Sequence, residues 1–309
     1  MTMPKRDHGG GLDAAIARFG GTREGWLDLS TGINPVPYPV GDFASDAWSA
    51  LPDQGAFDRL EDAACKLWSV PEGAGILAAP GASALIARIP SLLPAAEVQI
   101  AGPTYNEHAA GFRAQGWNVV DHAAPARVVV HPNNPDGRTW AGLDVDRPLT
   151  VIDESFCDVM PGDSLIELAT KPGVLILKSF GKFWGLAGLR LGFVIGDPEL
   201  INRLREAIGP WQVSGPALEL GARALGDLAW AEATRARLTQ DAARLDQLVG
   251  APLVGGTSLF RLYDVKDARA MQDKLAQAHV WSRVFPYSDG WLRLGLPHPD
   301  RWGQLEAAL

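Results

Sequence analysis

The chain has 309 residues, of which 47% are hydrophobic and 21% are charged, and its formal net charge at pH 7 is -8. This composition predicts a globular protein with room for one large domain and one smaller domain. The negative charge and the lack of a dense Lys/Arg cluster argue against a nucleic-acid partner, so we expect a small-molecule substrate. Cys65 and Cys157 lack metal-type spacing, and neither a signal-type segment nor a long apolar run is present. We therefore expect no metal, no membrane association and a cytoplasmic location.

Short apolar runs recur between residues 75 and 196, separated by helical or loop-like stretches. They cover residues 76–79, 98–100, 117–120, 128–131, 149–152, 174–178 and 191–195. Most are continuous rather than alternating, which is typical of strands that are buried on both faces of a parallel sheet. The sequence therefore predicts an α/β fold: a three-layer domain with a mostly parallel sheet of about seven strands, whose functional loops follow the strands.

The remaining pattern indicates helices and a second domain. Leu60, Ala64 and Trp68 share one helical face, and residues 216–250 keep helical spacing after a start signal at Ser214. After Gly255 and Gly256 the pattern predicts strand, helix, strand, strand and helix, at residues 258–263, 268–278, 280–285, 291–295 and from 299. We predict four parts: an N-terminal arm that contributes to the small domain and the substrate site (1–40), a large cofactor-binding domain (41–215), a long connecting helix (216–250) and a small α+β domain (251–309).

Polar residues follow three of the predicted strands. Asn134 precedes Pro135 in a turn, which holds its backbone extended, and Asp153 ends a buried strand, where a carboxylate needs donors or a cation to stay ionised. Lys182 lies among apolar and small residues, with Arg190 eight positions later, in the segment SFGKFWGLAGLRLGF. Taken alone, Asn134 is also explained by an ordinary tight turn, and Asp153 by an acid that caps the following helix. Together, an amide, an acid, a lysine and an arginine at successive strand ends match the needs of pyridoxal phosphate.

The segments NNPDG, VIDESF and SFGKFWGLAGLRLGF resemble the signature of the fold-type I pyridoxal-phosphate enzymes. The branch is the one that contains histidinol-phosphate aminotransferases and threonine-phosphate decarboxylases, and the similarity extends from HGG at residues 8–10 to WLRLG at 291–295. The resemblance implies a homodimer and a cofactor that is bound covalently by Lys182, paired at its pyridine nitrogen with Asp153 and hydrogen-bonded at its 3-oxygen by Asn134. The other implied cofactor contacts are Gly81, Ala82, Ser83, Ser179 and Arg190 at the phosphate, and Tyr105 stacked on the ring. Residues 81–83 are also explained as an ordinary helix N-cap, and a lone tyrosine at 105 as core packing.

The choice of reaction lies with residues outside that signature. Arg293 resembles the arginine that binds the substrate carboxylate in the aminotransferases, and Arg283 offers a second anion site, although surface charge explains either residue. Residues 28–35, DLSTGINP, with the preceding HGG, resemble the opening of threonine-phosphate decarboxylases, where it covers the substrate phosphate; an arm without function is the alternative. The implied substrate contacts are His8, Gly9, Gly32, Asn34, Arg283 and Arg293. Phe156 stands where the histidinol-phosphate branch usually has a tyrosine, which favours the decarboxylase.

Two positions depart from the resemblance. Leu51 replaces a tyrosine that in many relatives reaches the cofactor phosphate of the partner subunit. Gly32 replaces an asparagine that contacts substrate in some decarboxylases. Both changes affect the expected phosphate contacts.

The leading hypothesis is decarboxylation of O-phospho-L-threonine in cobalamin biosynthesis, with pyridoxal 5'-phosphate as the cofactor. The alternative is an aminotransferase that acts on histidinol phosphate or on an aromatic or other amino acid. A non-catalytic, pyridoxal-dependent regulator is disfavoured, because the sequence shows no DNA-binding domain. A dinucleotide-binding oxidoreductase is also disfavoured, because no predicted strand precedes Gly9-Gly10-Gly11, as a dinucleotide-binding loop requires.

Overall fold

The computed structural model describes residues 6–309 and divides the chain into two compact units. Unit 1 contains the residues up to Val36, then Pro135–Gly137 and Thr234–Leu309; unit 2 contains Pro37–Asn134 and Arg138–Ala233. The predicted arm, 1–40, begins with five residues that lie outside the described part. Within residues 6–309, no helix is both long enough and apolar enough to cross a membrane.

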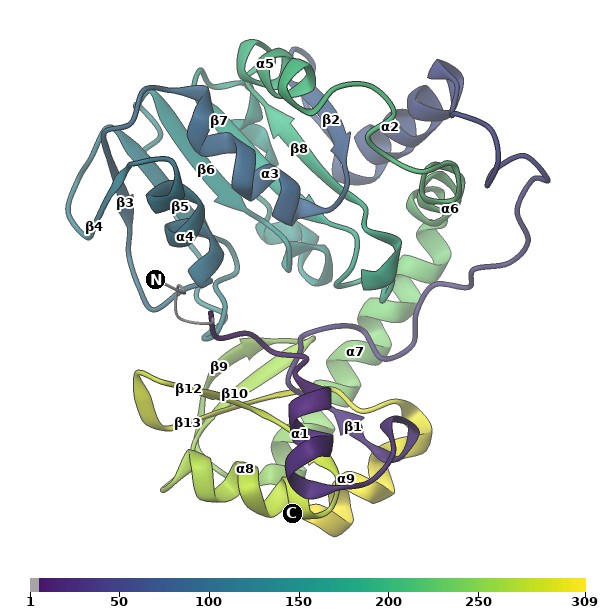
Figure 1. Ribbon diagram of the computed structural model, residues 1–309, viewed down its shortest axis with the longest axis vertical. Coiled ribbons are helices and arrows are strands. Elements are labelled where there is room, and N and C mark those ends of the chain that lie inside the picture. The colour runs from purple at the N-terminus through teal and green to yellow at the C-terminus, as the bar shows by residue number, and fades with distance from the viewer. Residues whose placement is uncertain (1–5) are drawn as a thin grey trace. The chain divides into compact units, whose positions relative to one another are not determined.

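Unit 2 is built on a seven-stranded sheet in the order β2-β8-β7-β6-β5-β3-β4 (Figure 1). Its strands are β2 (Gly75–Ala79), β3 (Glu97–Ile100), β4 (Asn118–Val120), β5 (Ala126–Val130), β6 (Leu149–Asp153), β7 (Val174–Ser179) and β8 (Gly192–Gly196). Strand β8 is antiparallel to both of its neighbours, and the other pairs are parallel. The predicted mostly parallel sheet and each of its seven strands are confirmed, because continuous apolar runs such as β6 and β7 are buried on both faces.

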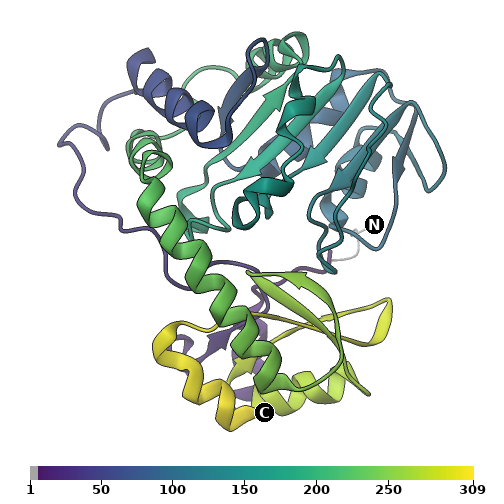
Figure 2. The ribbon, with the colours of Figure 1, turned by 180° about the vertical axis from the view of Figure 1, so that it is seen from behind.

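Helices cover the sheet. Helices α3 (Ala82–Arg88) and α4 (Asn106–Ala114) lie in front of the sheet in Figure 1 and behind it in Figure 2. With α5 (Pro198–Ile208) they share one apolar core with the strands. Helix α2 (Gln54–Trp68) buries its predicted face and packs against α6 (Gly215–Gly226). The short helices of this unit are η2 (Ile89–Leu92), η3 (Cys157–Val159), η4 (Pro161–Asp163), η5 (Ile166–Thr170) and η6 (Ala187–Leu189).

The connecting segment contains two helices where the sequence predicts one. Helix α6 ends at Gly226 and α7 (Leu228–Val249) begins after Asp227. The Asp227 carboxylate accepts a hydrogen bond from Trp230 N at 3.0 Å and so caps the new helix. Apolar spacing alone does not reveal this break, because the helical period continues across it.

Unit 1 is an α+β unit with a four-stranded antiparallel sheet in the order β12-β13-β10-β9 and a parallel pair formed by β1 and β11. Its strands are β1 (Leu27–Asp28), β9 (Leu253–Thr257), β10 (Phe260–Asp264), β11 (Val280–Trp281), β12 (Arg283–Phe285) and β13 (Ser288–Gly295). Its helices are α1 (Leu12–Phe19), η1 (Arg23–Gly25), α8 (Ala268–Gln277), η7 (Pro299–Arg301) and α9 (Trp302–Ala308). Strand β9 is not predicted from the sequence, because it contains Gly255 and Gly256. A Cβ atom at Gly255 would lie 2.1 Å from the Asp136 carbonyl oxygen, so glycine is required inside this strand.

Candidate active site

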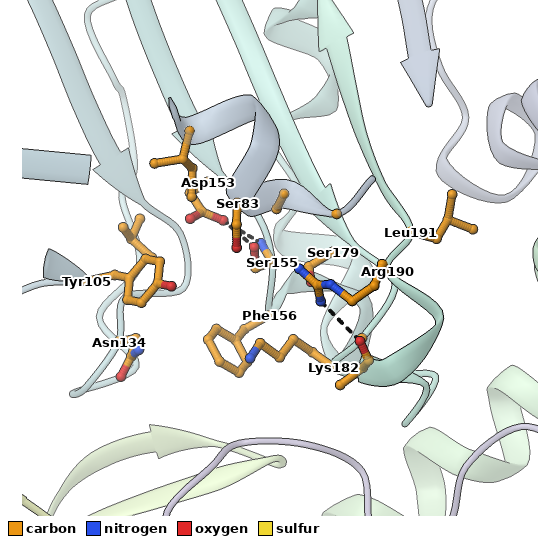
Figure 3. Close-up of a pocket in the computed structure, with 16 residues that line it drawn as sticks. Ser83, Tyr105, Asn134, Asp153, Ser155, Phe156, Ser179, Lys182, Arg190 and Leu191 are labelled. Atoms are coloured by element: carbon orange, nitrogen blue, oxygen red, sulfur yellow. Dashed lines mark hydrogen bonds between the residues drawn. The ribbon is translucent and has the colours of Figure 1, made fainter. Parts of the chain in front are cut away.

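One cavity in unit 2 brings together the nine residues that the sequence predicts for the cofactor (Figure 3). Its lining includes Gly81, Ala82, Ser83, Tyr105, Asn134, Asp153, Ser179, Lys182 and Arg190. Strands β5, β6 and β7 are parallel, so the residues that follow them in the sequence meet at one edge of the sheet. Ser155 and Phe156 also line the cavity.

Asp153 is buried and each of its carboxylate oxygens has a polar contact. Oδ1 accepts hydrogen bonds from Ser155 N at 2.9 Å and from Ser155 Oγ at 2.5 Å, and Oδ2 lies 2.8 Å from His108 Nε2. Burial alone would raise the pKa of Asp153, but the hydrogen bond and attraction of His108 and the donors of Ser155 outweigh it and hold the pKa below its usual value. The carboxylate is therefore ionised at neutral pH. An ionised carboxylate offers about four acceptor positions, so one position on Oδ2 is left for a ligand N–H.

His108 was not among the predicted site residues. It lies on α4, is 1% exposed, and its ring packs edge-on against Tyr105 at 6.0 Å between centroids. Because Asp153 is ionised and can only accept, His108 Nε2 donates the hydrogen bond between them. The sequence holds no signal for this contact, since the two residues are 45 positions apart.

Lys182 lines the cavity and is only partly buried. Its Nζ atom is 5.5 Å from the centre of the Phe156 ring, and Figure 3 shows the lysine side chain extended towards that ring. A Cβ atom at Gly181 would lie 2.9 Å from Ala187 Cα. The small residues of this segment therefore let the loop fold back on itself beside Lys182.

A group of donors in the cavity lining is suited to an anion. Arg190 has a left-handed backbone with a φ of 55° and donates from Nη1 to the Ala187 carbonyl at 3.0 Å. Its guanidinium lies over Gly81, where a Cβ atom would approach Nη2 to 2.8 Å. Ser83 and Ser179 add hydroxyl groups to the same lining. A guanidinium, two hydroxyls and backbone exposed by a glycine are a donor set that fits a phosphate ester.

The fully buried lysine of this region is Lys178 rather than Lys182. Its Nζ atom lies 2.5 Å from Glu154 Oε2, and the two side chains are 2% and 0% exposed. Glu154 also accepts from Leu165 N at 2.6 Å and from Ser164 Oγ at 2.7 Å. Because Glu154 follows Asp153 and Lys178 precedes Ser179, this ion pair joins the ends of β6 and β7 directly beside the cavity residues.

A cluster of His131, Glu154 and Cys157 has the residue types of a metal site, with ligand atoms within 4.8 Å of one another. The atoms already have other partners, however. His131 Nδ1 accepts from Trp140 N at 3.0 Å, and Nε2 lies 2.7 Å from the Asp163 carbonyl. Burial raises the pKa of the Cys157 thiol, which keeps it protonated. The cluster therefore does not fit a metal ion.

Two of the predicted substrate residues, Arg283 and Arg293, face each other across β12 and β13 in unit 1. Arg293 is 5% exposed and donates from Nη2 to the Ser30 carbonyl at 2.7 Å. Burial lowers its pKa to about 10, with the neighbouring charge of Arg283 acting in the same direction, so it remains charged at neutral pH. Arg283 binds both carboxylate oxygens of Asp7, at 2.6 and 2.8 Å. Ordinary solvated surface charge therefore does not describe either arginine.

The four other predicted substrate residues also belong to unit 1. His8 is exposed, whereas Gly32 and Asn34 are buried. The Asn34 Oδ1 atom accepts from Val36 N at 3.1 Å and from Arg237 Nη2 at 2.6 Å, so this oxygen holds its own loop. A Cβ atom at Gly9 would lie 2.4 Å from the Ser30 carbonyl oxygen, so glycine allows close packing there. The sequence gives no indication of Arg237.

Comparison with known proteins identifies the class. Residues 128–302 match the family of aminotransferases of class I and II, and the chain belongs to this family. It is 40% identical to a threonine-phosphate decarboxylase from Sinorhizobium sp. over 97% of this chain and 96% of that protein. It is 37% identical to the threonine-phosphate decarboxylase of Pseudomonas aeruginosa over 98% of this chain and 97% of that protein.

The fold resembles that of histidinol-phosphate aminotransferase from Sinorhizobium meliloti in complex with pyridoxal-5'-phosphate. The TM-score is 0.83 at 20% identity, with 100% of this chain and 94% of the other covered. The predicted fold class is thereby confirmed, as is the resemblance inferred from the motifs.

Proposed function

We propose that this chain catalyses the pyridoxal-phosphate-dependent decarboxylation of O-phospho-L-threonine to (R)-1-aminopropan-2-yl phosphate and carbon dioxide, a step of cobalamin biosynthesis. The observation that carries the proposal is the convergence of Lys182, Asp153 and Arg190 on one cavity, in a chain whose near-full-length relatives are threonine-phosphate decarboxylases. Phe156 supports this reaction over transamination by histidinol-phosphate aminotransferases, which usually have tyrosine at that position.

The cavity of unit 2 supports pyridoxal phosphate as the cofactor. We assign its phosphate to Arg190, Ser83 and Ser179, because a guanidinium and hydroxyls are the donors that a phosphate requires. When bound, the cofactor withdraws electrons from the substrate and stabilises the negative charge that develops at Cα. The remaining proposed contacts are Gly81 and Ala82 beside the phosphate, Asn134 at the 3-oxygen, Tyr105 on the ring face and Lys182 as the covalent attachment.

Asp153 has a defined task in this proposal. Its ionised carboxylate, held by His108 and Ser155, has one acceptor position left, which would accept from the protonated pyridine nitrogen of the bound cofactor. A protonated pyridine is the better electron acceptor, so the hydrogen bonds around Asp153 act on the reaction through this proton.

The overall reaction breaks the bond between Cα and the carboxylate, releases carbon dioxide and adds one proton to Cα. We assign the delivery of that proton to Lys182, because it lines the cavity and its amine, unlike the guanidinium of Arg190, exchanges a proton readily. Phe156, with its ring 5.5 Å from Lys182 Nζ, has no hydroxyl to donate to the reacting groups.

The substrate carries two anionic groups, a carboxylate and a phosphate, and unit 1 carries two arginines on adjacent strands. We propose that Arg283 and Arg293 bind these two groups, since guanidinium binds carboxylate and phosphate with two parallel hydrogen bonds. The further proposed substrate contacts are His8, Gly9, Gly32 and Asn34.

We also propose that the chain forms a homodimer in the cytoplasm. Trp48, Leu51 and Trp211 of unit 2 are 74%, 65% and 56% exposed, and large exposed apolar side chains support an interface. Leu51 cannot donate the hydrogen bond of the tyrosine that relatives carry. The thiols of Cys65 and Cys157 are free, which is compatible with a reducing compartment.

The test uses purified protein loaded with pyridoxal phosphate and supplied with O-phospho-L-threonine in the absence of any 2-oxo acid. The wild type is expected to release carbon dioxide and to show a visible absorbance band of the lysine-bound cofactor. Lys182→Ala should lack both. The proposal is wrong if no carbon dioxide appears and the protein transfers amino groups to 2-oxoglutarate in a parallel reaction to which that acceptor is added.

A further inference from the structure

The segment of residues 6–11 is attached to the rest of unit 1 at two places, Ser30 and Arg283. Gly10 N donates to Ser30 Oγ at 2.7 Å, and Ser30 Oγ in turn donates to Asp28 Oδ1 at 2.6 Å. Gly9 packs so closely on Ser30 that no larger residue fits there. These contacts hold the segment beside the loop that precedes Gly32 and Asn34.

The second attachment is the ion pair between Asp7 and Arg283. Nη1 of Arg283 lies 2.6 Å from Asp7 Oδ1, and Nη2 lies 2.8 Å from Oδ2. The side chain of Arg283 is 13% exposed, whereas that of Asp7 is 45% exposed. Asp7 thus covers the end of the guanidinium with the same two-pronged geometry that a substrate carboxylate or phosphate uses.

The surroundings explain why an anion is held there. Arg283 lies directly opposite the buried Arg293 in the register of β12 and β13. Two neighbouring guanidinium groups repel each other, and a nearby carboxylate reduces that repulsion. Asp7 supplies this carboxylate from a segment that bends at Gly9 and Gly10, so the anion is attached to the chain by a short tether.

We propose that Asp7 is a displaceable internal counter-ion of Arg283, which occupies the guanidinium until a phosphate group binds there in its place. Asp7 thereby lowers the apparent affinity of Arg283 for every incoming anion, because each anion must displace the same carboxylate. Because Asp7 is tethered, its carboxylate competes for Arg283 at an effective concentration in the millimolar range. A free carboxylate at a lower concentration therefore does not displace it. A phosphate carries almost two negative charges and three acceptor oxygens, so it binds Arg283 more strongly than a carboxylate and displaces Asp7. The inference rests on the proposed function in one respect, that Arg283 binds an anionic group of the substrate.

The test measures the dissociation constants of inorganic phosphate and of acetate by calorimetry at pH 7.5. The protein is loaded with pyridoxal phosphate, so that the phosphate site of unit 2 is filled. Asp7→Asn should bind inorganic phosphate roughly three- to tenfold more tightly than the wild type, the range expected for loss of a half-exposed, bidentate competing carboxylate. Acetate binding should tighten by a similar factor. Asp13→Asn is the matched control: Asp13 lies nearby in the sequence, is 97% exposed and contacts Arg23 at 3.5 Å, and its replacement should leave both constants unchanged.

A second variant locates the effect. In an Arg283→Gln background, Asp7→Asn should change neither constant. Amide hydrogen exchange of residues 6–8 in the wild type should also increase when phosphate is added, because Asp7 is released while Gly10 stays bound to Ser30. The proposal is overturned if Asp7→Asn binds phosphate equally or more weakly, since Asp7 would then have no competing role or would position Arg283.

This outcome is separable from a failure of the proposed function. If the wild type releases no carbon dioxide from O-phospho-L-threonine but Asp7→Asn tightens phosphate binding, the decarboxylase assignment fails and the counter-ion stands. If carbon dioxide is released but phosphate binding does not tighten, the counter-ion fails and the decarboxylase stands.

Discussion

Replacing Lys178 with methionine tests how the edge of the sheet that carries the cavity is held. Methionine keeps the length of the side chain but removes the charge that lies 2.5 Å from Glu154, which is 0% exposed. Removing one partner of a buried ion pair leaves an uncompensated charge and typically costs about 3–5 kcal/mol of unfolding free energy. That is a large part of the roughly 5–15 kcal/mol by which domains are stable.

The pH dependence of this loss follows from the pKa of Lys178. Burial lowers this pKa, but the charges of Glu154 and of neighbouring acidic groups, together with the hydrogen bond to Glu154, outweigh burial and hold the pKa above its usual value. A group whose pKa is raised in the folded state adds its full amount to the unfolding free energy below its unfolded-state pKa, about 10.4 for lysine. This stabilisation is lost as the pH rises through the folded-state pKa. The destabilisation by Lys178→Met should therefore be the same at pH 7 and at pH 9.

The assay is urea unfolding followed by circular dichroism, with Lys171→Met as the control because Lys171 is exposed and lies at the start of the same region. The control should change the unfolding free energy by less than about 0.5 kcal/mol. The double variant Lys178→Met with Glu154→Gln should recover part of the loss, because the unpaired charge is removed. The reasoning is refuted if Lys178→Met is no more harmful than the control, or if Glu154→Gln adds further loss instead of recovering it.

Two further predictions concern the cavity itself. Gly81→Ala places a methyl group 2.8 Å from Arg190 Nη2, at a backbone φ of +85° that alanine rarely adopts. The substitution should therefore weaken pyridoxal-phosphate binding by about tenfold, or about 1.4 kcal/mol. Titration of the apoenzyme measures the dissociation constant, and an unchanged value contradicts the prediction. His108→Phe removes a donor that keeps the pKa of Asp153 low, so this pKa should rise and decarboxylation should fail at a higher pH as the solution is acidified. An acid limb of the rate profile at the wild-type position refutes that role.

Much of the fold is predictable because the strands of a parallel sheet are apolar on both faces, and their continuous runs stand out in the sequence. The prediction misses β9, whose Gly255 and Gly256 resemble a break in the chain. They are needed inside the strand, because Asp136 packs against the backbone there. The break between α6 and α7 is also missed, since it depends on the side chain of Asp227 acting as a cap.

The candidate site is predictable to the extent that its residues follow consecutive strands. The ends of β5, β6 and β7 bring Asn134, Asp153 and Lys182 to one edge of the sheet, as their order in the chain indicates. His108 is not predictable in this way, because its partner lies on another element. The sequence also does not reveal that Lys178 is more buried than Lys182, since this depends on the acidic partner at the end of the adjacent strand.

The most direct test of the central claim follows the atoms of the substrate. O-phospho-L-threonine labelled with ¹³C in its carboxylate is incubated with the enzyme in heavy water, without a 2-oxo acid. The account predicts that the label leaves entirely as carbon dioxide and that the amine product keeps its original Cα hydrogen and gains one deuterium at that carbon. Retention of the ¹³C in a 2-oxo acid, with loss of the Cα hydrogen, would contradict decarboxylation and identify an aminotransferase.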